Sequence, residues 1–395
     1  MRTAKMIGIG GVGAALALAV TIPVSSAGAS SSPTPSISVS SFNNSFVAMK
    51  SLQGLTKEGK GKVAAILPDT VSSTRYVEFD APDIQRALVA AGLPTSDIII
   101  QNALGSDATQ LTDAQTDITN GATVLLVDPL DSGVGASIEN YAKSHGVPVI
   151  DYDRLTLGGS RKYYVSFNNV TVGKLIGKGF AACVAAWHVS KPQVAVMHGA
   201  ATDNNATLFA QGYDSVIDPY FNSGKWVHVV STADTWDPPT AETEFQEAYT
   251  AHSNINSAVT PNDETTAPII TYLQSLHVQP KTFPLTGQDA TLTGLDNVLS
   301  GYQCGTVYKP IYLEAQAATA LALYLRAGKT PPSSLVNGKT TDTTTNTKVA
   351  SVLETPEWVT TKNMNATVIK DNFVPAAQLC AGTYANDCTA AGITP

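Results

Sequence analysis

Charged residues are scarce in this chain of 395 residues: Asp, Glu, Lys and Arg together make up 14%. The 32 acidic residues outnumber the 24 basic ones, and no basic block stands out. A nucleic-acid-binding surface needs clustered Lys and Arg to displace counterions, so we expect no nucleic-acid partner. No period of 20–50 residues recurs, which argues against solenoids and propellers. Hydrophobic residues make up 43%, so the chain can build a core, and its length indicates two domains.

Metal-binding and phosphate-binding patterns are also missing. No CxxC pair occurs, and the six histidines are scattered, so we predict no zinc site and no other metal. No GxxxxGK[ST] loop occurs, and we expect no cofactor. The four cysteines allow three disulfide pairings. Cys380 and Cys388 flank a Gly-Thr-Tyr turn, which favours a bridge between them and leaves Cys183 with Cys304. Free or metal-binding thiols are the alternative.

The chain has one long apolar run, at residues 6–24, preceded by Arg2 and Lys5. Small residues ending at Ala29 follow it, as in a signal peptide that is cleaved near Ala29. A retained membrane anchor is the alternative, but the run is rich in Gly and Ala and barely long enough to span. No cysteine lies near the cut, so we expect a secreted, extracytoplasmic protein without a lipid anchor. Residues 30–41 are rich in Ser and Pro and are predicted to be flexible, and we assign 30–60 to a leader segment.

Short β-rich runs alternate with amphipathic stretches along the rest of the chain. Such alternation predicts βαβ units, and therefore an α/β fold with two doubly wound parallel-sheet lobes. The expected strands are 62–67, 98–101, 123–127, 147–152, 163–167, 193–197, 226–230, 257–260, 283–286 and 306–308. The expected helices are 82–91, 138–145, 172–187, 206–220, 241–252, 267–276 and 311–326. The segment 349–353 also resembles a strand, whereas 340–347 is predicted to be a polar loop.

Polar side chains gather directly after these strands, where open parallel sheets bind their ligands. They are rich in Asp, Asn and Arg and poor in Lys and Glu. This composition suits sugar hydroxyls, since carboxylates accept hydrogen bonds from them and amides and cations donate hydrogen bonds to them. Some of these residues simply cap the next helix, and Asn262 is the most cap-like of them. Tyr76, Phe209 and Trp236 are available to cover the apolar face of a sugar ring. Lys309 follows an apolar strand and needs a counterion, for which we predict Asp289.

Several segments resemble the periplasmic sugar-binding proteins of ABC transporters, and specifically the xylose-binding group. The resemblance spans about residues 60–330 in matching order. It is carried by Arg75-Tyr76, Tyr152-Asp153-Arg154, residues 164–169, Asp203-Asn204-Asn205-Ala206, Asn262-Asp263, Gly287-Gln288-Asp289-Ala290 and residues 306–311.

This resemblance implies two lobes joined by a three-segment hinge, with the ligand bound between them. We assign 1–29 to the signal peptide, 61–166 with 308–335 to the first lobe, and 167–307 with 336–395 to the second. The ligand contacts implied by the family are Arg75, Tyr76, Asp153, Arg154, Asp203, Asn205, Trp236, Asn262, Asp289 and Lys309. The implied function is capture of a monosaccharide, with D-xylose as first choice, and delivery by a monomeric protein to an ABC permease.

Three other functions are compatible with parts of the sequence. A sugar receptor that signals to a sensor kinase or chemoreceptor would look the same. An exported glycoside hydrolase would use a carboxyl pair such as Asp151 and Asp153, but Arg154 beside Asp153 would hold its pKa low, unlike a general acid. A sugar-responsive transcription regulator would need an N-terminal helix-turn-helix, where this chain has the apolar run and the Ser-rich stretch.

Overall fold

The structure is a computed structural model that describes residues 37–394. The predicted signal peptide lies outside the described residues, as does the beginning of the predicted leader. No helix within 37–394 is both long and apolar enough to cross a membrane.

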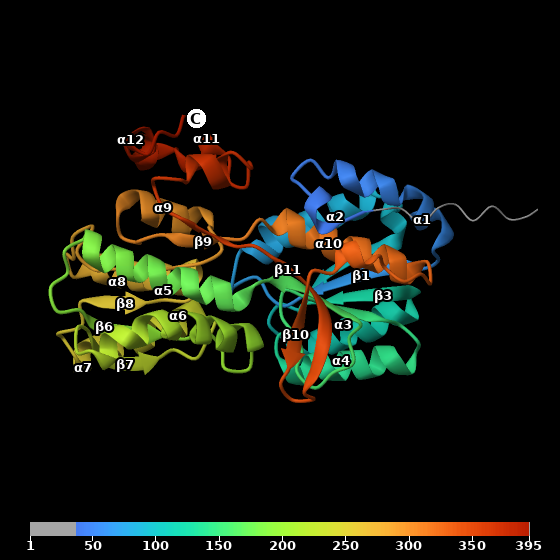
Figure 1. Ribbon diagram of the computed structural model, residues 1–395, viewed down its shortest axis with the longest axis horizontal. Helices are drawn as coiled ribbons and strands as arrows, with labels where there is room; N and C mark the ends of the chain where they lie inside the picture. Colours follow the sequence, from blue (N-terminus) through green and yellow to red (C-terminus); the bar gives the residue numbers. More distant parts are fainter. Residues whose placement is uncertain (1–36, 395) are drawn as a thin grey trace, which may run out of the picture. The chain divides into compact units, whose positions relative to one another are not determined.

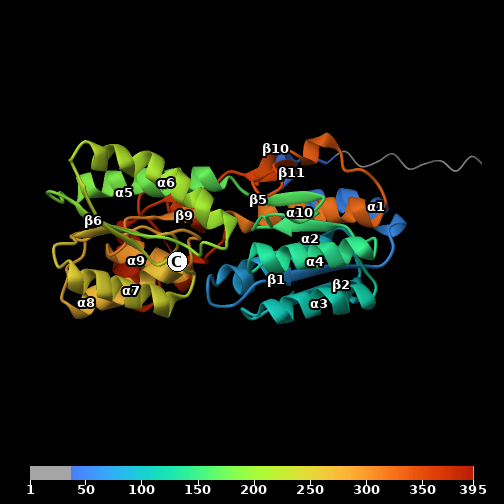
Figure 2. The same cartoon turned by 90° about the horizontal axis from the view of Figure 1, so that it is seen from below.

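A seven-stranded sheet with the order β10-β11-β5-β4-β3-β1-β2 forms the first lobe (Figures 1 and 2). Six of its strands are parallel, and the edge strand β10 is antiparallel to β11. The strands are β1 (Lys62–Leu67), β2 (Ile98–Asn102), β3 (Ala122–Val127), β4 (Val149–Tyr152), β5 (Tyr163–Phe167), β10 (Gly338–Asp342) and β11 (Thr347–Glu354). The apolar run Val63–Leu67 in β1 is buried throughout, as expected for a strand that is covered on both faces.

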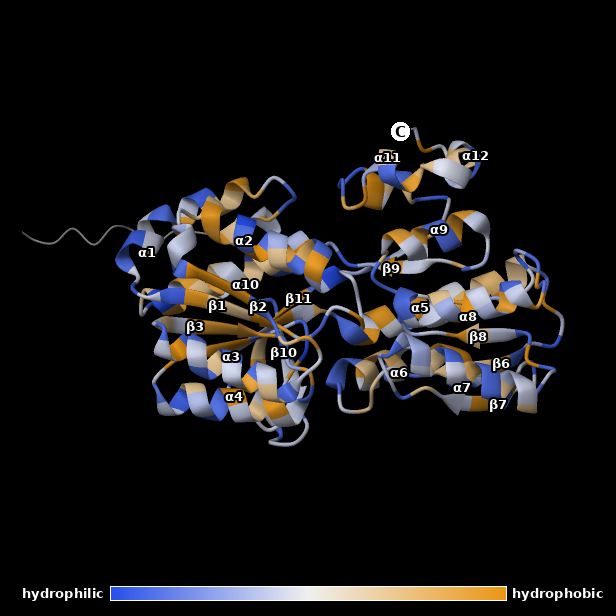
Figure 3. Ribbon diagram, turned by 180° about the vertical axis from the view of Figure 1, so that it is seen from behind, coloured by the Kyte–Doolittle hydropathy of each residue, from blue (hydrophilic) through white to orange (hydrophobic). Residues whose placement is uncertain are grey.

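Helices cover both faces of this sheet, and its apolar strands lie between them (Figure 3). The helices α2 (Ala81–Ala90) and α10 (Ile311–Arg326) pack on one face, and α3 (Asp107–Thr119) and α4 (Ser132–Ser144) pack on the other. The first helices, η1 (Val39–Ser41), η2 (Val47–Leu52) and α1 (Gln53–Glu58), precede β1. Met49, Leu52 and Leu55 from this segment are buried in the same core as α2.

The second lobe has a parallel sheet with the order β7-β6-β8. Its strands are β6 (Gln193–Met197), β7 (Val227–Thr232) and β8 (Ser257–Val259). Residues 284–288 run beside β8 and connect it through backbone contacts to the antiparallel pair β9 (Thr306–Tyr308) and β12 (Glu357–Val359). The helices are α5 (Asn169–Ala186), α6 (Asn204–Asn222), α7 (Pro238–Ala251), α8 (Asp263–Ser275) and α9 (Leu292–Ser300).

Two glycines let α5 and α6 touch at their backbones. A Cβ atom on Gly173 would lie 2.0 Å from the carbonyl oxygen of Phe209, and one on Gly212 would lie 2.4 Å from that of Val170. Any larger residue at either position would separate the helices. This contact matters for the candidate ligand-binding site described below, because both helices begin next to that site.

The chain passes between the lobes three times. It crosses from β5 to α5, returns from β9 to α10 across Lys309 and Pro310, and crosses again from β11 to β12 across residues 355–356. The third crossing shows that the assignment of 336–354 to the second lobe is wrong, because β11 pairs with β5 in the first-lobe sheet. Of the predicted loop 340–347, residues 340–342 and 347 belong to β10 and β11, which pair antiparallel, and residues 343–346 form the turn between them.

Three further expectations differ from the structure. Residues 39–41 and 47–58 are helical, and several residues of 37–58 are buried, so the leader is wrong over its described residues. The predicted strand 283–286 is extended and bonded to β8 but is not a regular strand. Helices α3 and α9 were not predicted.

Both predicted disulfides are present, Cys183–Cys304 and Cys380–Cys388, and both lie in the second lobe and its tail. All four tryptophans of the chain (Trp187, Trp226, Trp236 and Trp358) belong to the second lobe as well. The first lobe therefore contains neither cysteine nor tryptophan.

The C-terminal tail, residues 360–394, packs beside α9 and includes α11 (Ala376–Leu379) and α12 (Ala385–Ala390) (Figure 1). It also contacts the first lobe. Phe373 stacks on Phe79 with ring centroids 3.8 Å apart, and the Asp371 carboxylate accepts hydrogen bonds from Tyr308 and Tyr312. The tail thus touches both lobes next to the second crossing.

Candidate ligand-binding site

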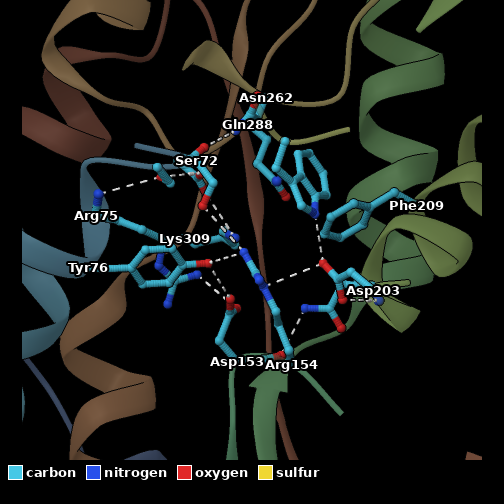
Figure 4. A pocket seen from close by; sticks show the side chains of 14 residues that line it. Ser72, Arg75, Tyr76, Asp153, Arg154, Asp203, Phe209, Asn262, Gln288 and Lys309 are labelled. Atoms are coloured by element: carbon cyan, nitrogen blue, oxygen red, sulfur yellow. Dashed lines mark hydrogen bonds and ion pairs between the residues drawn. The ribbon is translucent and has the colours of Figure 1, made fainter. Parts of the chain in front are cut away.

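One cavity is lined by residues from both lobes and from the second crossing (Figure 4). All ten residues predicted as ligand contacts line it. The four that were not predicted as contacts are Ser72, Ser73, Phe209 and Gln288.

Arg75 lies at the first-lobe wall, just before the short helix η3 (Tyr76–Asp80), and only 1% of it is exposed. Its guanidinium donates to Asp80 at 2.8 and 2.7 Å, to Glu314 at 2.8 Å and to Asp153 at 2.9 Å. Four of its five N–H donors are therefore used inside the protein. Burial acts to lower the pKa of Arg75, but these three carboxylates raise it well above its ordinary value. Arg75 mainly orients Asp153 and has one donor left for a ligand.

Asp153 follows β4 and has a left-handed backbone, with φ of 55°. Non-glycine residues with such backbones cluster at functional sites, and Asp tolerates them better than most. Its carboxylate accepts from Arg75 and, at 3.2 Å, from the hydroxyl of Tyr76. Burial would raise the pKa of Asp153, but Arg75, Lys309 and Arg154 together lower it below the ordinary value. Asp153 is thus a fixed anion with spare acceptor capacity.

Arg154 makes mostly long contacts within the site. Its one short hydrogen bond goes to the Tyr76 hydroxyl at 3.0 Å (Figure 4). Its other contacts are long: 3.4 Å to Ser72 Oγ and to two backbone carbonyls, 3.5 Å from Nε to Asp203 and 3.7 Å to Asp128. A buried guanidinium with such long contacts can donate to a ligand.

The second lobe contributes Asp203, the N-cap of α6, whose Oδ1 accepts from the backbone N–H of Asn205. Its Oδ2 accepts from the indole N–H of Trp236 at 3.0 Å. Burial raises the pKa of Asp203, and Arg154 opposes this shift. Asn205 donates to the backbone carbonyl of Asp153 at 2.9 Å, so it bridges the lobes.

Asp289 and Lys309 form the ion pair that the sequence predicted, with Lys309 Nζ 2.8 Å from Asp289 Oδ1. Each is 3% exposed. The other oxygen of Asp289 accepts from Ser73 Oγ at 2.8 Å. Asp289, like Asp153, has a left-handed backbone, with φ of 92°. An ammonium has three donors, and the pair with Asp289 uses one of them.

Direct hydrogen bonds join the lobes around the cavity, so the structure shows the closed arrangement. Asn262 caps α8 as expected, but it also donates across the cleft to the backbone carbonyl of Ser72 at 2.8 Å. Glu264 accepts from the backbone N–H and the hydroxyl of Thr74. Together with the Ser73–Asp289 bond, these contacts connect one loop of the first lobe to α8 and to the loop before α9.

The charges that line the cavity balance. Three cations (Arg75, Arg154 and Lys309) face three anions (Asp153, Asp203 and Asp289). Gln288 adds a buried amide oxygen without a hydrogen-bond partner among the described residues. Within residues 37–394 no group of acidic, His and Cys side chains is arranged to hold a metal ion. The wall therefore offers both acceptors and donors and no excess charge.

Some functional residues were missed because they do not follow a strand. Asp80 lies at the end of η3 and Glu314 in the first turn of α10, and both hold Arg75 from behind. Asp128 does follow a strand, but it lies behind Arg154 rather than in the cavity lining. A buried guanidinium needs carboxylate partners, so the expected burial of Arg75 was a signal that such partners exist.

A family model described as a periplasmic binding protein domain matches residues 64–330. This chain belongs to the periplasmic binding protein family. Its members are substrate-binding proteins, and this one is not an enzyme. The D-xylose-binding periplasmic protein of Escherichia coli K12 is 34% identical over 71% of this chain and 83% of its own length. The multiple sugar-binding periplasmic receptor ChvE of Rhizobium radiobacter is 28% identical over 81% and 92%.

Solved structures confirm the type I periplasmic-binding-protein fold. A carbohydrate transporter solute-binding protein from Chloroflexus aurantiacus, in complex with D-glucose, has a TM-score of 0.70 and 25% identity, and covers 80% of this chain and 97% of its own. An ABC transporter solute-binding protein from Clostridium phytofermentans with bound β-D-glucose has a TM-score of 0.72 at 23% identity, covering 80% and 99%. The named relatives are periplasmic proteins, which agrees with an extracytoplasmic location for this periplasmic binding protein.

Proposed function

We propose that the protein captures one neutral monosaccharide, with D-xylose as first candidate, in the interlobe cavity and delivers it to an ABC permease. The observation that carries this proposal is the balanced, interlobe set of charged donors and acceptors beside Trp236. An anionic ligand would favour an excess of cations, whereas a neutral polyol needs both kinds of partner. The xylose-binding relatives support D-xylose, but other relatives and similar structures bind other sugars.

Each ligand contact is proposed from the atoms that remain available. Arg154 and Lys309 would donate to sugar oxygens, while Asp153, Asp203 and Asp289 would accept from sugar hydroxyls. Trp236 would cover the C–H face of the ring. Asn205 and Asn262 already bond across the cleft, so they would couple ligand binding to closure.

The proposed mechanism is hinge closure at the three crossings. Each lobe carries part of the donors and acceptors, so a sugar that contacts both lobes binds the closed state better and shifts the population toward it. The closed protein, acting as a monomer, would then dock on the permease. The relative named a receptor supports a second role, in which the same closed form signals to a sensor.

A thermal-shift panel of D-xylose, L-arabinose, D-ribose, D-galactose and D-glucose tests the function. A sugar at 100 times its Kd should add about 2.7 kcal/mol to the free energy of unfolding. D-Glucuronate is the matched control, because it has the ring of D-glucose with an added negative charge. Stabilisation by glucuronate and by none of the neutral sugars would contradict the proposal. Calorimetry on the best sugar then gives Kd, and size-exclusion chromatography checks the monomer.

A further inference from the structure

Gly199 lies against the indole of Trp236, directly after β6 and His198. A Cβ atom built on Gly199 would lie 2.3 Å from both Cζ2 and Cη2 of the indole and 2.8 Å from Cε2. Ordinary contacts of a Cβ atom begin at 3.4 Å, so a side chain at this position needs about 1 Å of movement by the ring. The backbone of Gly199 is not left-handed, so the indole is the obstacle to a side chain here.

The indole is held in place on its other sides. Its N–H donates to Asp203 Oδ2 at 3.0 Å, and its ring meets Phe209 edge to face with centroids 6.3 Å apart. Both of these partners also line the cavity. A ring pushed away from the backbone of residue 199 would have to break the bond to Asp203, press on Phe209, or enter the cavity.

We propose that Gly199 is a positioning residue: it determines how closely the Trp236 indole approaches the backbone at residue 199, and therefore how far the indole extends into the cavity where the sugar ring would bind. The inference rests on the proposed function, because it assumes that the indole covers a ligand. Gly199 itself does not line the cavity. Its contribution is the absence of a side chain, which lets the indole rest on the backbone instead of extending further into the cavity.

The chain offers a matched control. A Cβ atom on Gly179 in α5 would also lie 2.3 Å from an indole, that of Trp358, and Trp358 does not line the cavity. Gly179→Ala therefore creates the same kind of clash in the same lobe without touching the site. We expect both alanine variants to lower the urea midpoint, whereas only Gly199→Ala should change ligand affinity.

Titration calorimetry with D-xylose and D-glucose tests this. We expect Gly199→Ala to raise Kd at least tenfold and Gly179→Ala to leave it within twofold. In a Trp236→Phe background, whose ring is smaller, adding Gly199→Ala should change Kd by less than twofold. Equal affinity of wild type and Gly199→Ala, or an undiminished loss in the Trp236→Phe background, would overturn the inference. If Gly199→Ala alone does not fold, the Trp236→Phe background must restore folding.

A ligand-free measurement separates this inference from the proposed function. Acrylamide quenching of Trp236, obtained by subtracting the Trp236→Phe variant, should differ between wild type and Gly199→Ala. Identical quenching would overturn the inference whatever the ligand is. Failure of every neutral sugar to bind the wild type, with quenching changed as expected, would instead remove the sugar proposal and leave the positioning of Trp236 intact.

Discussion

Replacing Asp289 by Asn gives the sharpest test of the charge arrangement. The substitution keeps the shape of the side chain, and Asn tolerates the left-handed backbone at this position as well as Asp does. It removes the negative charge 2.8 Å from Lys309 Nζ, in a pair of which each member is 3% exposed. Lys309 would then be a buried cation that has lost its nearest counterion.

Asp289→Asn should lower both the stability of the protein and its affinity for the ligand. Removing one partner of a buried pair costs about 3–5 kcal/mol of stability when the other charge stays unpaired. Asp153 also acts electrostatically on Lys309, so we expect the lower end, about 3 kcal/mol. A charged hydrogen bond to the ligand is worth about 2 kcal/mol, which corresponds to a roughly thirtyfold weaker Kd.

Urea unfolding and titration calorimetry with the best sugar of the panel measure these two losses. Asp107→Asn is the control, since Asp107 is exposed in the first turn of α3 and should change neither quantity. The double variant Asp289→Asn/Lys309→Met should be more stable than Asp289→Asn alone, because no unpaired charge remains. An unchanged Kd in Asp289→Asn would refute the role of Asp289 in binding, and an unchanged urea midpoint would refute the buried pair.

Two further predictions concern stability. Burial raises the pKa of Glu354, at the end of β11, to about 7, above its ordinary 4.5. The folded state therefore binds an extra proton between pH 4.5 and 7, and the wild type loses stability as the pH rises through that window. Glu354→Gln should be about 2–3 kcal/mol more stable than wild type at pH 8 and equal to it near pH 4.5. A stability difference that does not vary with pH would contradict this prediction. Replacing Cys183 and Cys304 by Ser opens a loop with a sequence separation of 121 and should cost about 5 kcal/mol, against about 2.5 for Cys380 and Cys388 with a separation of 8. Equal urea midpoints for the two double variants would argue against loop length as the cause.

The sequence was informative where the fold repeats a local rule. The parallel strands β1, β3, β6 and others are short apolar runs. Polar residues follow them at the carboxyl ends of the two sheets, such as Asp153 in the first lobe and Asp203 in the second, and these residues line the same cavity. The resemblance to sugar-binding proteins then selected the residues that line the cavity from the larger set of polar strand ends.

The remaining errors come from contacts between distant segments. Helix α3 buries Gln110 and Asp117 together with Ala114, so its inward face does not look apolar in the sequence. The hairpin of β10 and β11 joins the first lobe only because β11 pairs with β5, about 190 residues earlier in the chain. No local pattern records such a pairing. Asp80 and Glu314, which form ion pairs with Arg75, likewise lie on helices rather than at strand ends.

The separation of residue types between the lobes has a practical consequence. Because every indole lies in the second lobe, tryptophan emission, excited at wavelengths that tyrosine does not absorb, comes from that lobe alone. Because all four sulfhydryl groups are consumed in bridges, a single cysteine introduced on the first lobe would be the one reactive thiol of the protein. A dye attached there would accept energy from the indoles, and its brightness would follow the opening and closing of the two halves in real time.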